Sequence, residues 1–253
     1  MINSKKLSRF REIKHGFFNK KGGKSKTIYK SLNCGLGSSD RKKNVISNLK
    51  IVCKKIGVSY KKLILLNQIH SNKFHFIKKN YNFKKKRIIG DALITNVSNI
   101  AIGVLTADCV PILIYDKNKK IISAIHAGWK GAYKGIINNV VNFFTKNGSN
   151  PKNLIAVIGP CISEKNYEVK KDFKNKFLKK NRLNKLFFKK RKNKTYFCLN
   201  KYIYSQLRKL GIKNLEIINK DTFDPKNNFF SARRAIINKE NDYGRNISII
   251  MIN

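Results

Sequence analysis

The chain of 253 residues has little negative charge, few histidines and no long apolar run. No stretch reaches the roughly 18 consecutive apolar residues of a transmembrane helix, so no membrane partner is expected. The basic start, MINSKKLSRFREIKHGF, has no apolar stretch behind it, so we expect no secretory signal. Five cysteines at irregular spacings do not form a disulfide framework, and reduced thiols in a cytoplasmic protein are expected.

The scarcity of acidic residues leaves a formal net charge of +43, with 56 Lys and Arg against 13 Asp and Glu. Such a charge attracts polyanions, so nucleic-acid binding is one interpretation. However, the excess is mostly lysine, and lysine, asparagine and isoleucine are abundant along the whole chain. A nucleic-acid site usually concentrates arginine and aromatic residues on one face. We therefore expect nonspecific anion binding at low salt and no specific nucleic-acid partner.

Two glycine-rich segments near the start match phosphate-binding loops only in part. GGKS at 22–25 lacks the first glycine of a P-loop, because Phe18 occupies that position. GLGSSD at 35–40 has Asp40 where a dinucleotide-binding fingerprint has its third glycine. The sequence therefore predicts neither of these nucleotide folds, and residues 15–40 are typical of a long loop with turns.

Apolar periodicity predicts a mixture of helices and strands. Val45, Leu49 and Val52 recur at helical spacing, and residues 130–148 form a second amphipathic helix that ends at a glycine. The lysine-rich stretch 170–194 is expected to form surface helices. Short apolar strands are expected at 62–71, 90–96, 100–106, 111–116, 121–129, 153–162, 214–219 and 246–252. This pattern indicates a single α/β or α+β domain.

Three residues lie where apolar strands give way to polar residues. His70 follows one strand in NQIHS, Cys109 separates two apolar runs in TADCVP, and His126 ends a strand in AIHAGW. Folds that contain sheets often place their sites at such positions. Two imidazoles and one thiolate suit catalytic zinc, which uses three protein ligands and keeps a fourth position open. A cysteine–histidine nucleophile pair would need the same residues, and a structural role for each is the alternative.

Two acidic residues stand close to these candidates in the sequence. Asp91 opens the GDALIT strand, and Asp108 directly precedes Cys109. Either carboxylate could orient a histidine ligand or transfer a proton, so both join Cys109 and His126 as candidate catalytic residues. For Asp108, a turn-capping role is the alternative.

Three arginines are candidates for phosphate binding. Arg233, Arg234 and Arg245 stand out in a chain that otherwise uses lysine. A planar guanidinium binds phosphate through two parallel hydrogen bonds, which a lysine cannot do. A surface ion pair is the alternative for each.

Six motifs follow one another along the chain: NQIHS, GDALIT, TADCVPILI, HAGWKG, GPCISEKNYEV, and FFSARR with a later GR. In this order and spacing they resemble the laccase-domain family, also called polyphenol oxidase, peptidoglycan editing factor or purine nucleoside phosphorylase. The opening HGFF, GGKS and YKSLNCG segments match as well, so the resemblance covers nearly the whole chain.

The resemblance implies an α+β fold, a single domain over residues 1–253 with mixed β-sheets in a layered α/β/β/α sandwich. It implies a cytoplasmic monomer or homodimer whose metal, usually Zn²⁺ and with copper possible in vitro, is held by His70, Cys109 and His126. The implied reaction is cleavage of adenosine, inosine, guanosine and methylthioadenosine by phosphate. Its products are the free base and (methylthio)ribose 1-phosphate, and adenosine deamination is the implied second activity.

Four positions depart from the family pattern and bear on contacts to substrate or phosphate. NKKGG has lysine where arginine is frequent, Leu49 replaces a helix arginine, Ala232 replaces a tyrosine, and Asp221 stands where cysteine is frequent. None of these changes removes an implied metal ligand.

Two other functions remain open from the sequence. One is a cysteine or metal hydrolase that edits peptidoglycan precursors through Cys109 and His126. The other is a copper-dependent phenol oxidase, which we consider less favoured because multinuclear copper sites need more histidines than the four present.

Overall fold

The computed structural model describes residues 1–83 and 87–253, and its core is two β-sheets packed face to face. The four-stranded sheet consists, in spatial order, of β1 (Ile13–Phe17), β13 (Asn246–Ile252), β5 (Ala101–Thr106) and β2 (Leu63–Leu65). The six-stranded sheet consists of β12 (Asn214–Ile217), β8 (Leu154–Ile158), β6 (Val110–Asp116), β7 (Ile121–Ala127), β4 (Ala92–Thr95) and β3 (Phe74–Ile77). Both sheets combine parallel and antiparallel pairs.

Strand β6 shows why the central sequence is apolar without interruption. Leu113 and Tyr115 face the other sheet, whereas Ile112 and Ile114 face the helices, so the strand is buried on both sides. A strand that is covered on both faces has no solvent side and needs no polar alternation.

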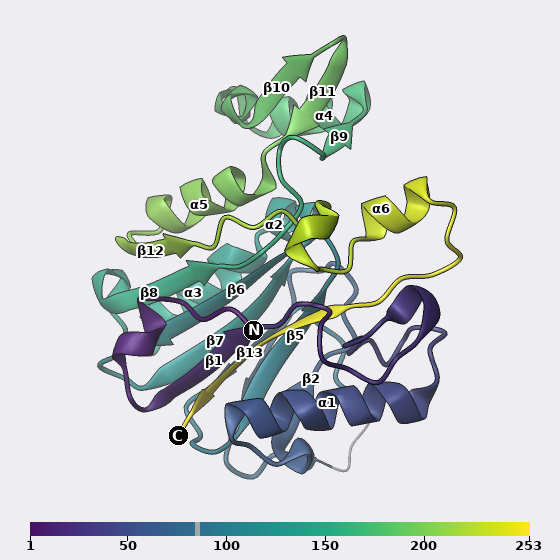
Figure 1. Cartoon of the computed structure of the whole chain (residues 1–253). Helices are drawn as coiled ribbons and strands as arrows, with labels where there is room; N and C mark the ends of the chain where they lie inside the picture. The colour runs from purple at the N-terminus through teal and green to yellow at the C-terminus, as the bar shows by residue number, and fades with distance from the viewer. Residues whose placement is uncertain (84–86) are drawn as a thin grey trace.

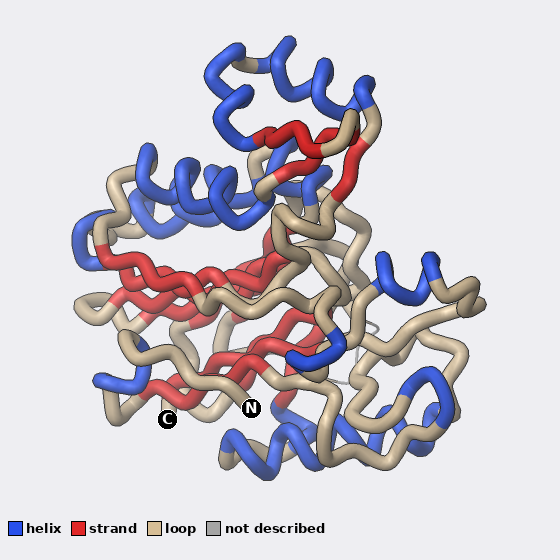
Figure 2. Tube along the Cα trace, turned by 45° about the horizontal axis from the view of Figure 1, so that its top comes forward, coloured by secondary structure: helices blue, strands red, loops and turns tan. Residues whose placement is uncertain are grey.

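Helices cover the outer face of each sheet (Figure 1, Figure 2). Helix α1 (Lys42–Ile56) packs Val45, Leu49 and Val52 on the four-stranded sheet. Helices α2 (Trp129–Lys134), α3 (Ile136–Lys146) and α5 (Leu199–Lys209) cover the six-stranded sheet. The expected helix over 130–148 is divided at Gly135, whose φ of 92° breaks it. The predicted α/β/β/α layers are confirmed.

A lobe formed by residues 168–197 projects from this body (Figure 1). It contains β9 (Glu168–Val169), α4 (Lys171–Lys180), β10 (Phe188–Arg191) and β11 (Lys194–Phe197). The prediction of surface helices is correct for α4 and wrong for β10, which pairs with β11 in a hairpin. Lys192 and Asn193 both have positive φ, as the two-residue turn of such a hairpin requires.

The remaining elements are short. Helix α6 (Ala232–Ile237) follows the FFS segment. Short 3₁₀ helices lie at Leu7–Arg9, Thr27–Tyr29, Tyr60–Lys62, Pro151–Asn153, Arg182–Phe187 and Pro225–Asn227.

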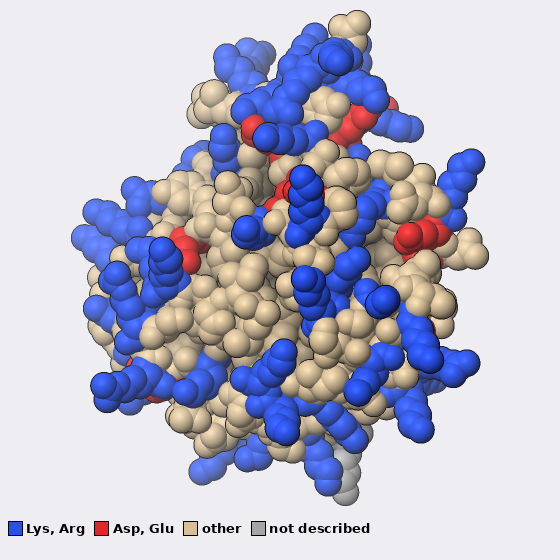
Figure 3. All heavy atoms as spheres, viewed as in Figure 1, with Lys and Arg blue, Asp and Glu red and all other residues tan. Residues whose placement is uncertain are grey.

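The surface charge is spread widely. Figure 3 shows Lys and Arg over both the body and the lobe of the face in view, with few acidic residues between them. All five cysteines are unpaired. Among the described residues, no helix is both long and apolar enough to cross a membrane.

Phe177 joins the lobe to the body and should be the residue on which the stability of that junction depends. Its buried ring lies 4.8 Å from the ring of Phe173, 4.9 Å from Phe197 and 5.2 Å from Tyr202. We expect Phe177→Ala to lower the free energy of unfolding by about 3–5 kcal/mol in urea titrations. Leu186→Ala, at a site 70% exposed in the same lobe, should change it by less than about 0.5 kcal/mol. Equal effects would contradict this packing.

Candidate functional site

The structure brings His70, Cys109 and His126 together at one end of the two sheets. One ligand atom from each residue lies within 4.8 Å of the other two, and the two imidazole rings are 4.7 Å apart between centroids. His70 is exposed, Cys109 is half-buried and His126 is buried, so the cluster opens toward solvent on the side of His70.

Cys109 lies where the chain crosses from one sheet to the other. Strand β5 belongs to the four-stranded sheet and β6 to the six-stranded sheet, and residues 107–109 connect them. This crossing explains why an acid and a thiol interrupt two apolar runs: the connection leaves both buried sheets at that point. His126 lies on the adjacent strand β7, where it pairs with Pro111 of β6 and is therefore close to Cys109.

Asp108 fixes the shape of this crossing. Its φ of 86° is uncommon for a residue other than glycine. Its buried carboxylate accepts hydrogen bonds from Thr222 Oγ1 at 2.7 Å, Ser231 Oγ at 2.9 Å and the backbone N–H of Arg233 at 2.7 Å. Burial raises the pKa of the Asp108 carboxyl above its ordinary value, although these donors oppose the change. The carboxylate thus tethers the crossing to Thr222, Ser231 and the start of α6.

Asp91, at the start of β4, contacts both histidine segments. Its carboxylate accepts hydrogen bonds from the backbone N–H of His70 at 3.0 Å and from Nδ1–H of His126 at 2.8 Å. The backbone N–H and hydroxyl of Ser71 donate to it as well. Because a carboxylate only accepts, His126 must carry a proton on Nδ1, so Nε2 is the ring atom that could bind a metal. Burial raises the pKa of Asp91, but hydrogen bonds from His126 and Ser71 outweigh it and bring the pKa to about 2.

The thiol of Cys109 is electrostatically coupled to both imidazoles. Burial raises its pKa, but hydrogen bonding and charge from His126 and His70 outweigh this effect and bring the pKa to about 7. For His126, burial lowers the pKa, whereas Cys109 and Asp91 raise it to about 9. Without a metal, the pair therefore favours a thiolate beside an imidazolium near neutral pH.

Gly128 is the residue that leaves room for this cluster. A Cβ atom at this position would lie 2.7 Å from Nδ1 of His70 and 2.9 Å from Sγ of Cys109. Any larger residue would push these two donor atoms away from their present positions.

The cluster forms one wall of a polar cavity of about 330 Å³. Arg245 and Arg87 also line it, together with Gln68 and Tyr243. The guanidinium of Arg245 donates to Asp242 Oδ1 at 2.9 Å and stacks 4.3 Å from the ring centroid of Tyr243. No sequence motif predicts Arg87 or Tyr243 as site residues, because their place in the cavity depends on loop conformations that leave no local pattern in the sequence.

The other two candidate arginines lie elsewhere. Arg234 donates to the backbone carbonyls of Thr222, Phe223 and Phe229, so its guanidinium is occupied by the loops around α6. Arg233 donates to the carbonyl of Glu168 and lines a separate aromatic cavity.

Three departures from the family pattern can be located in the structure. Leu49 is fully buried in the contact between α1 and its sheet. Asp221 accepts hydrogen bonds from the Ser163 hydroxyl and the Asn166 amide, and thereby holds a turn. Ala232 is the first residue of α6.

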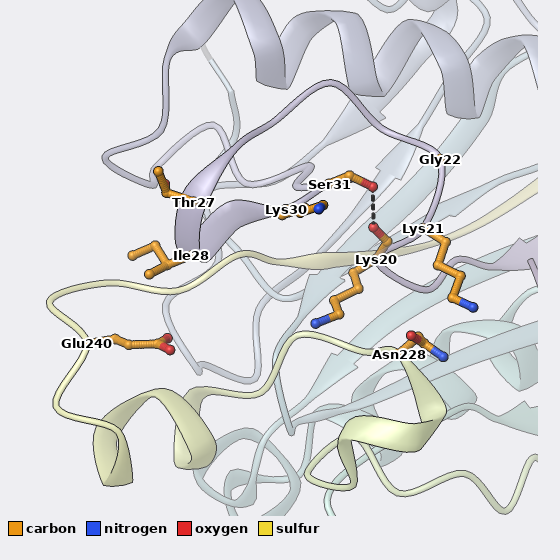
Figure 4. Close-up of a pocket in the computed structure, with 9 residues that line it drawn as sticks. All are labelled: Lys20, Lys21, Gly22, Thr27, Ile28, Lys30, Ser31, Asn228 and Glu240. Carbon is orange, nitrogen blue, oxygen red and sulfur yellow. Dashed lines mark hydrogen bonds between the residues drawn. The ribbon is translucent and has the colours of Figure 1, made fainter.

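The incomplete P-loop segment forms a different cavity, of about 690 Å³ (Figure 4). Its lining residues are Lys20, Lys21, Gly22, Thr27, Ile28, Lys30, Ser31, Asn228 and Glu240. The backbone N–H groups of Gly23, Lys24 and Ser25 donate to Ser31 and Asn48. A P-loop needs such groups free to hold a phosphate, so the prediction that this segment is not one is confirmed.

Comparisons with known proteins agree with this fold. Residues 14–253 match the family model described as multi-copper polyphenol oxidoreductase laccase. A Rickettsia conorii protein named purine nucleoside phosphorylase is 35% identical over 216 residues, covering 82% of this chain and 86% of the relative. A Haemophilus influenzae protein of the same name is 32% identical over 234 residues, covering 91% of each. The crystal structure of the Bacillus licheniformis hypothetical protein YfiH gives a TM-score of 0.87 at 28% identity, covering 95% of this chain and 93% of that one.

The charge of Asp91 should stabilise the metal-free protein at neutral pH, and this stabilisation should be lost in acid. Because folding lowers its pKa from 3.8 to about 2, its contribution of roughly 2 kcal/mol is present above pH 4 and is lost as the pH falls toward 2. We expect Asp91→Asn to be less stable than the wild type at pH 7, with a difference that shrinks between pH 4 and pH 2.

Urea titrations across this pH range, in the presence of a chelator, measure the effect. Asp172→Asn, which changes an exposed carboxylate in the first turn of α4, is the control and should show a clearly smaller dependence, because an exposed charge at a helix N-terminus contributes little. A difference for Asp91→Asn that stays constant down to pH 2 would show that its charge does not stabilise the fold.

Proposed function

Since the chain belongs to the multi-copper polyphenol oxidoreductase laccase family and its relatives are named purine nucleoside phosphorylases, we propose that it is a zinc-dependent purine nucleoside phosphorylase. The observation that carries the proposal is the His70–Cys109–His126 cluster on a cavity that also contains two arginines. Its proposed substrates are adenosine, inosine, guanosine and methylthioadenosine with phosphate, and adenosine deamination is the proposed second activity.

The donor atoms fit a single zinc ion. Imidazole and thiolate are both ligands of catalytic zinc, which takes three protein ligands, and a buried carboxylate that orients one imidazole is their usual support. Asp91 provides that support for His126, and Gly128 leaves space beside the other two donors. Zn²⁺ bound there would supply a Lewis acid to the cavity. The same donors would also accept copper in vitro.

The family description names multi-copper chemistry, for which this chain has few ligands. The other two histidines lie outside the cluster: His15 Nε2 accepts a hydrogen bond from the backbone of Ser4, and His75 Nε2 contacts the carbonyl of Ile89. A site with three donors suits one metal ion, and this is why we favour phosphorolysis over phenol oxidation.

Phosphorolysis requires the phosphate to be held against C1′ of the nucleoside. We assign this task to Arg245 and Arg87, whose guanidinium groups line the cavity of the cluster. A phosphate oxygen gives up its proton and forms the new bond to C1′, while the electrons of the broken C–N bond leave with the base, which takes up a proton in exchange. Cys109 and His126 are the proposed catalytic residues beside the metal, whereas Asp91 and Asp108 position them. Arg234 has no role in this proposal, because backbone carbonyls occupy it.

A second candidate is a cysteine hydrolase that edits peptidoglycan precursors. The observation that favours it is the lowered pKa of Cys109, about 7, beside His126. Activity that survives exhaustive chelation but is lost on thiol alkylation would support this alternative over the phosphorylase. We place either enzyme in the cytoplasm, where five unpaired cysteines stay reduced.

Cys109→Ser should remove both the metal and the activity while the fold remains. Protein purified without a nickel column should contain about one zinc per wild-type chain and less than a tenth of that in the variant. Release of hypoxanthine from inosine should require phosphate, and kcat/KM should fall by at least about 100-fold in the variant.

Cys198→Ser is the matched control, because its buried Sγ contacts Asn200 and a hydroxyl can replace that contact. This variant should keep both zinc and activity. Stoichiometric zinc in Cys109→Ser would refute the ligand assignment, and base release without phosphate would refute phosphorolysis.

A further inference from the structure

A second cavity, of about 650 Å³, lies next to the His70–Cys109–His126 cluster and is not used by the proposed reaction. Aromatic and cationic side chains make up most of its lining, namely Trp129, Tyr167, Phe173, Lys170, Lys176 and Arg233, and Val169, Glu168 and Asp172 complete it. None of these residues lines the cavity of the His70–Cys109–His126 cluster.

Two short links join this cavity to the cluster. Trp129 directly follows Gly128, the residue that lies against His70 and Cys109. The backbone N–H of Arg233 holds the Asp108 carboxylate, one residue from Cys109. A ligand in the cavity would therefore contact the same segments that hold the cluster.

The aromatic side of the cavity offers a surface for a planar ring. Trp129 is half-buried, and its ring packs edge-on against that of Phe173, with centroids 4.9 Å apart. The Nζ atom of Lys176 lies 5.6 Å from the centroid of the indole ring, so a positive charge lies beside the aromatic surface. Stacking on such rings is worth about 1–3 kcal/mol per nucleic-acid base and tolerates any planar heterocycle.

The cavity also offers an anchor for an anion. Arg233 makes no ion pair within the described part of the chain, and its only hydrogen bond from the guanidinium goes to the Glu168 carbonyl. The guanidinium lies 5.5 Å from the ring centroid of Tyr167, which limits its orientation. The remaining N–H groups can therefore bind a phosphate, with Lys170 and Lys176 nearby in the lining.

We propose that this cavity binds a nucleoside 5′-monophosphate, with its base against Trp129 and Phe173 and its phosphate on Arg233. A ring without a phosphate would leave the arginine unused, and a phosphate without a ring would leave the aromatic wall exposed. The volume lies within the range of about 300–1,000 Å³ that is usual for small-molecule sites. The proposal goes beyond the phosphorylase and does not require that activity.

The test uses the fluorescence of Trp129, which is the single tryptophan of the chain. At about 150 mM salt, AMP should quench this fluorescence saturably, with adenosine and ribose 5-phosphate binding at least about tenfold more weakly. The salt screens the general positive charge, so a response at this concentration reports a built site. Equal binding of AMP and adenosine would refute the phosphate anchor, and equal binding of AMP and ribose 5-phosphate would refute the aromatic wall.

Arg233→Gln should weaken AMP binding about tenfold and leave adenosine binding unchanged, because its backbone contact with Asp108 remains. Arg191→Gln is the matched control, since Arg191 also lies 5.5 Å from a tyrosine ring, that of Tyr196, but outside this cavity. An equal loss in both variants would assign the binding to overall charge and overturn the proposal.

Quenching by AMP should persist in Cys109→Ser, which lacks a ligand of the proposed metal. The nucleotide site and the phosphorylase are therefore tested independently. Loss of quenching in that variant would overturn the claim that the site is separate from the metal centre.

Discussion

The Asp91 carboxylate is the contact on which the arrangement of the cluster depends. It accepts hydrogen bonds from the backbone of His70, from Ser71 and from the ring of His126, so one buried charge fixes two segments that are far apart in sequence. A buried carboxylate with this many donors keeps its charge, and that charge in turn sets the tautomer of His126. The site is thus built by electrostatics inside the fold and does not rely on the lysines of the surface.

A second buried carboxylate completes the arrangement from the other side. Asp108 tethers the crossing between the sheets to Thr222, Ser231 and the start of α6, and so holds Cys109 opposite the two histidines. From the sequence, Asp108 could orient a histidine, transfer a proton or cap a turn. Its hydrogen bonds fit the capping role, although they reach residues far along the chain and not only the local turn.

Much of the architecture could be predicted because burial leaves a strong local pattern. Strands β5 and β6 were predicted within a residue or two of their ends, since runs buried on both faces are apolar throughout. Helix α1 was predicted from the spacing of Val45, Leu49 and Val52. The β10–β11 hairpin was missed because its strands are rich in lysine and its turn uses Lys192 and Asn193, with no glycine to indicate a positive φ.

The environments of the arginines could not be predicted, because each depends on loops that are distant in sequence. Arg245 lines the cluster cavity, Arg234 is held by backbone carbonyls, and Arg233 faces the aromatic cavity. The sequence gives no reason to assign these three arginines different roles, and their different environments follow only from the tertiary fold.

The most direct test of the metal centre is X-ray absorption spectroscopy at the zinc edge, on protein purified without added metal. Our account predicts one sulfur ligand at about 2.3 Å and nitrogen or oxygen ligands at about 2.0–2.1 Å, from Cys109 and the two histidines. A zinc shell without sulfur, or protein that contains no metal, would contradict it.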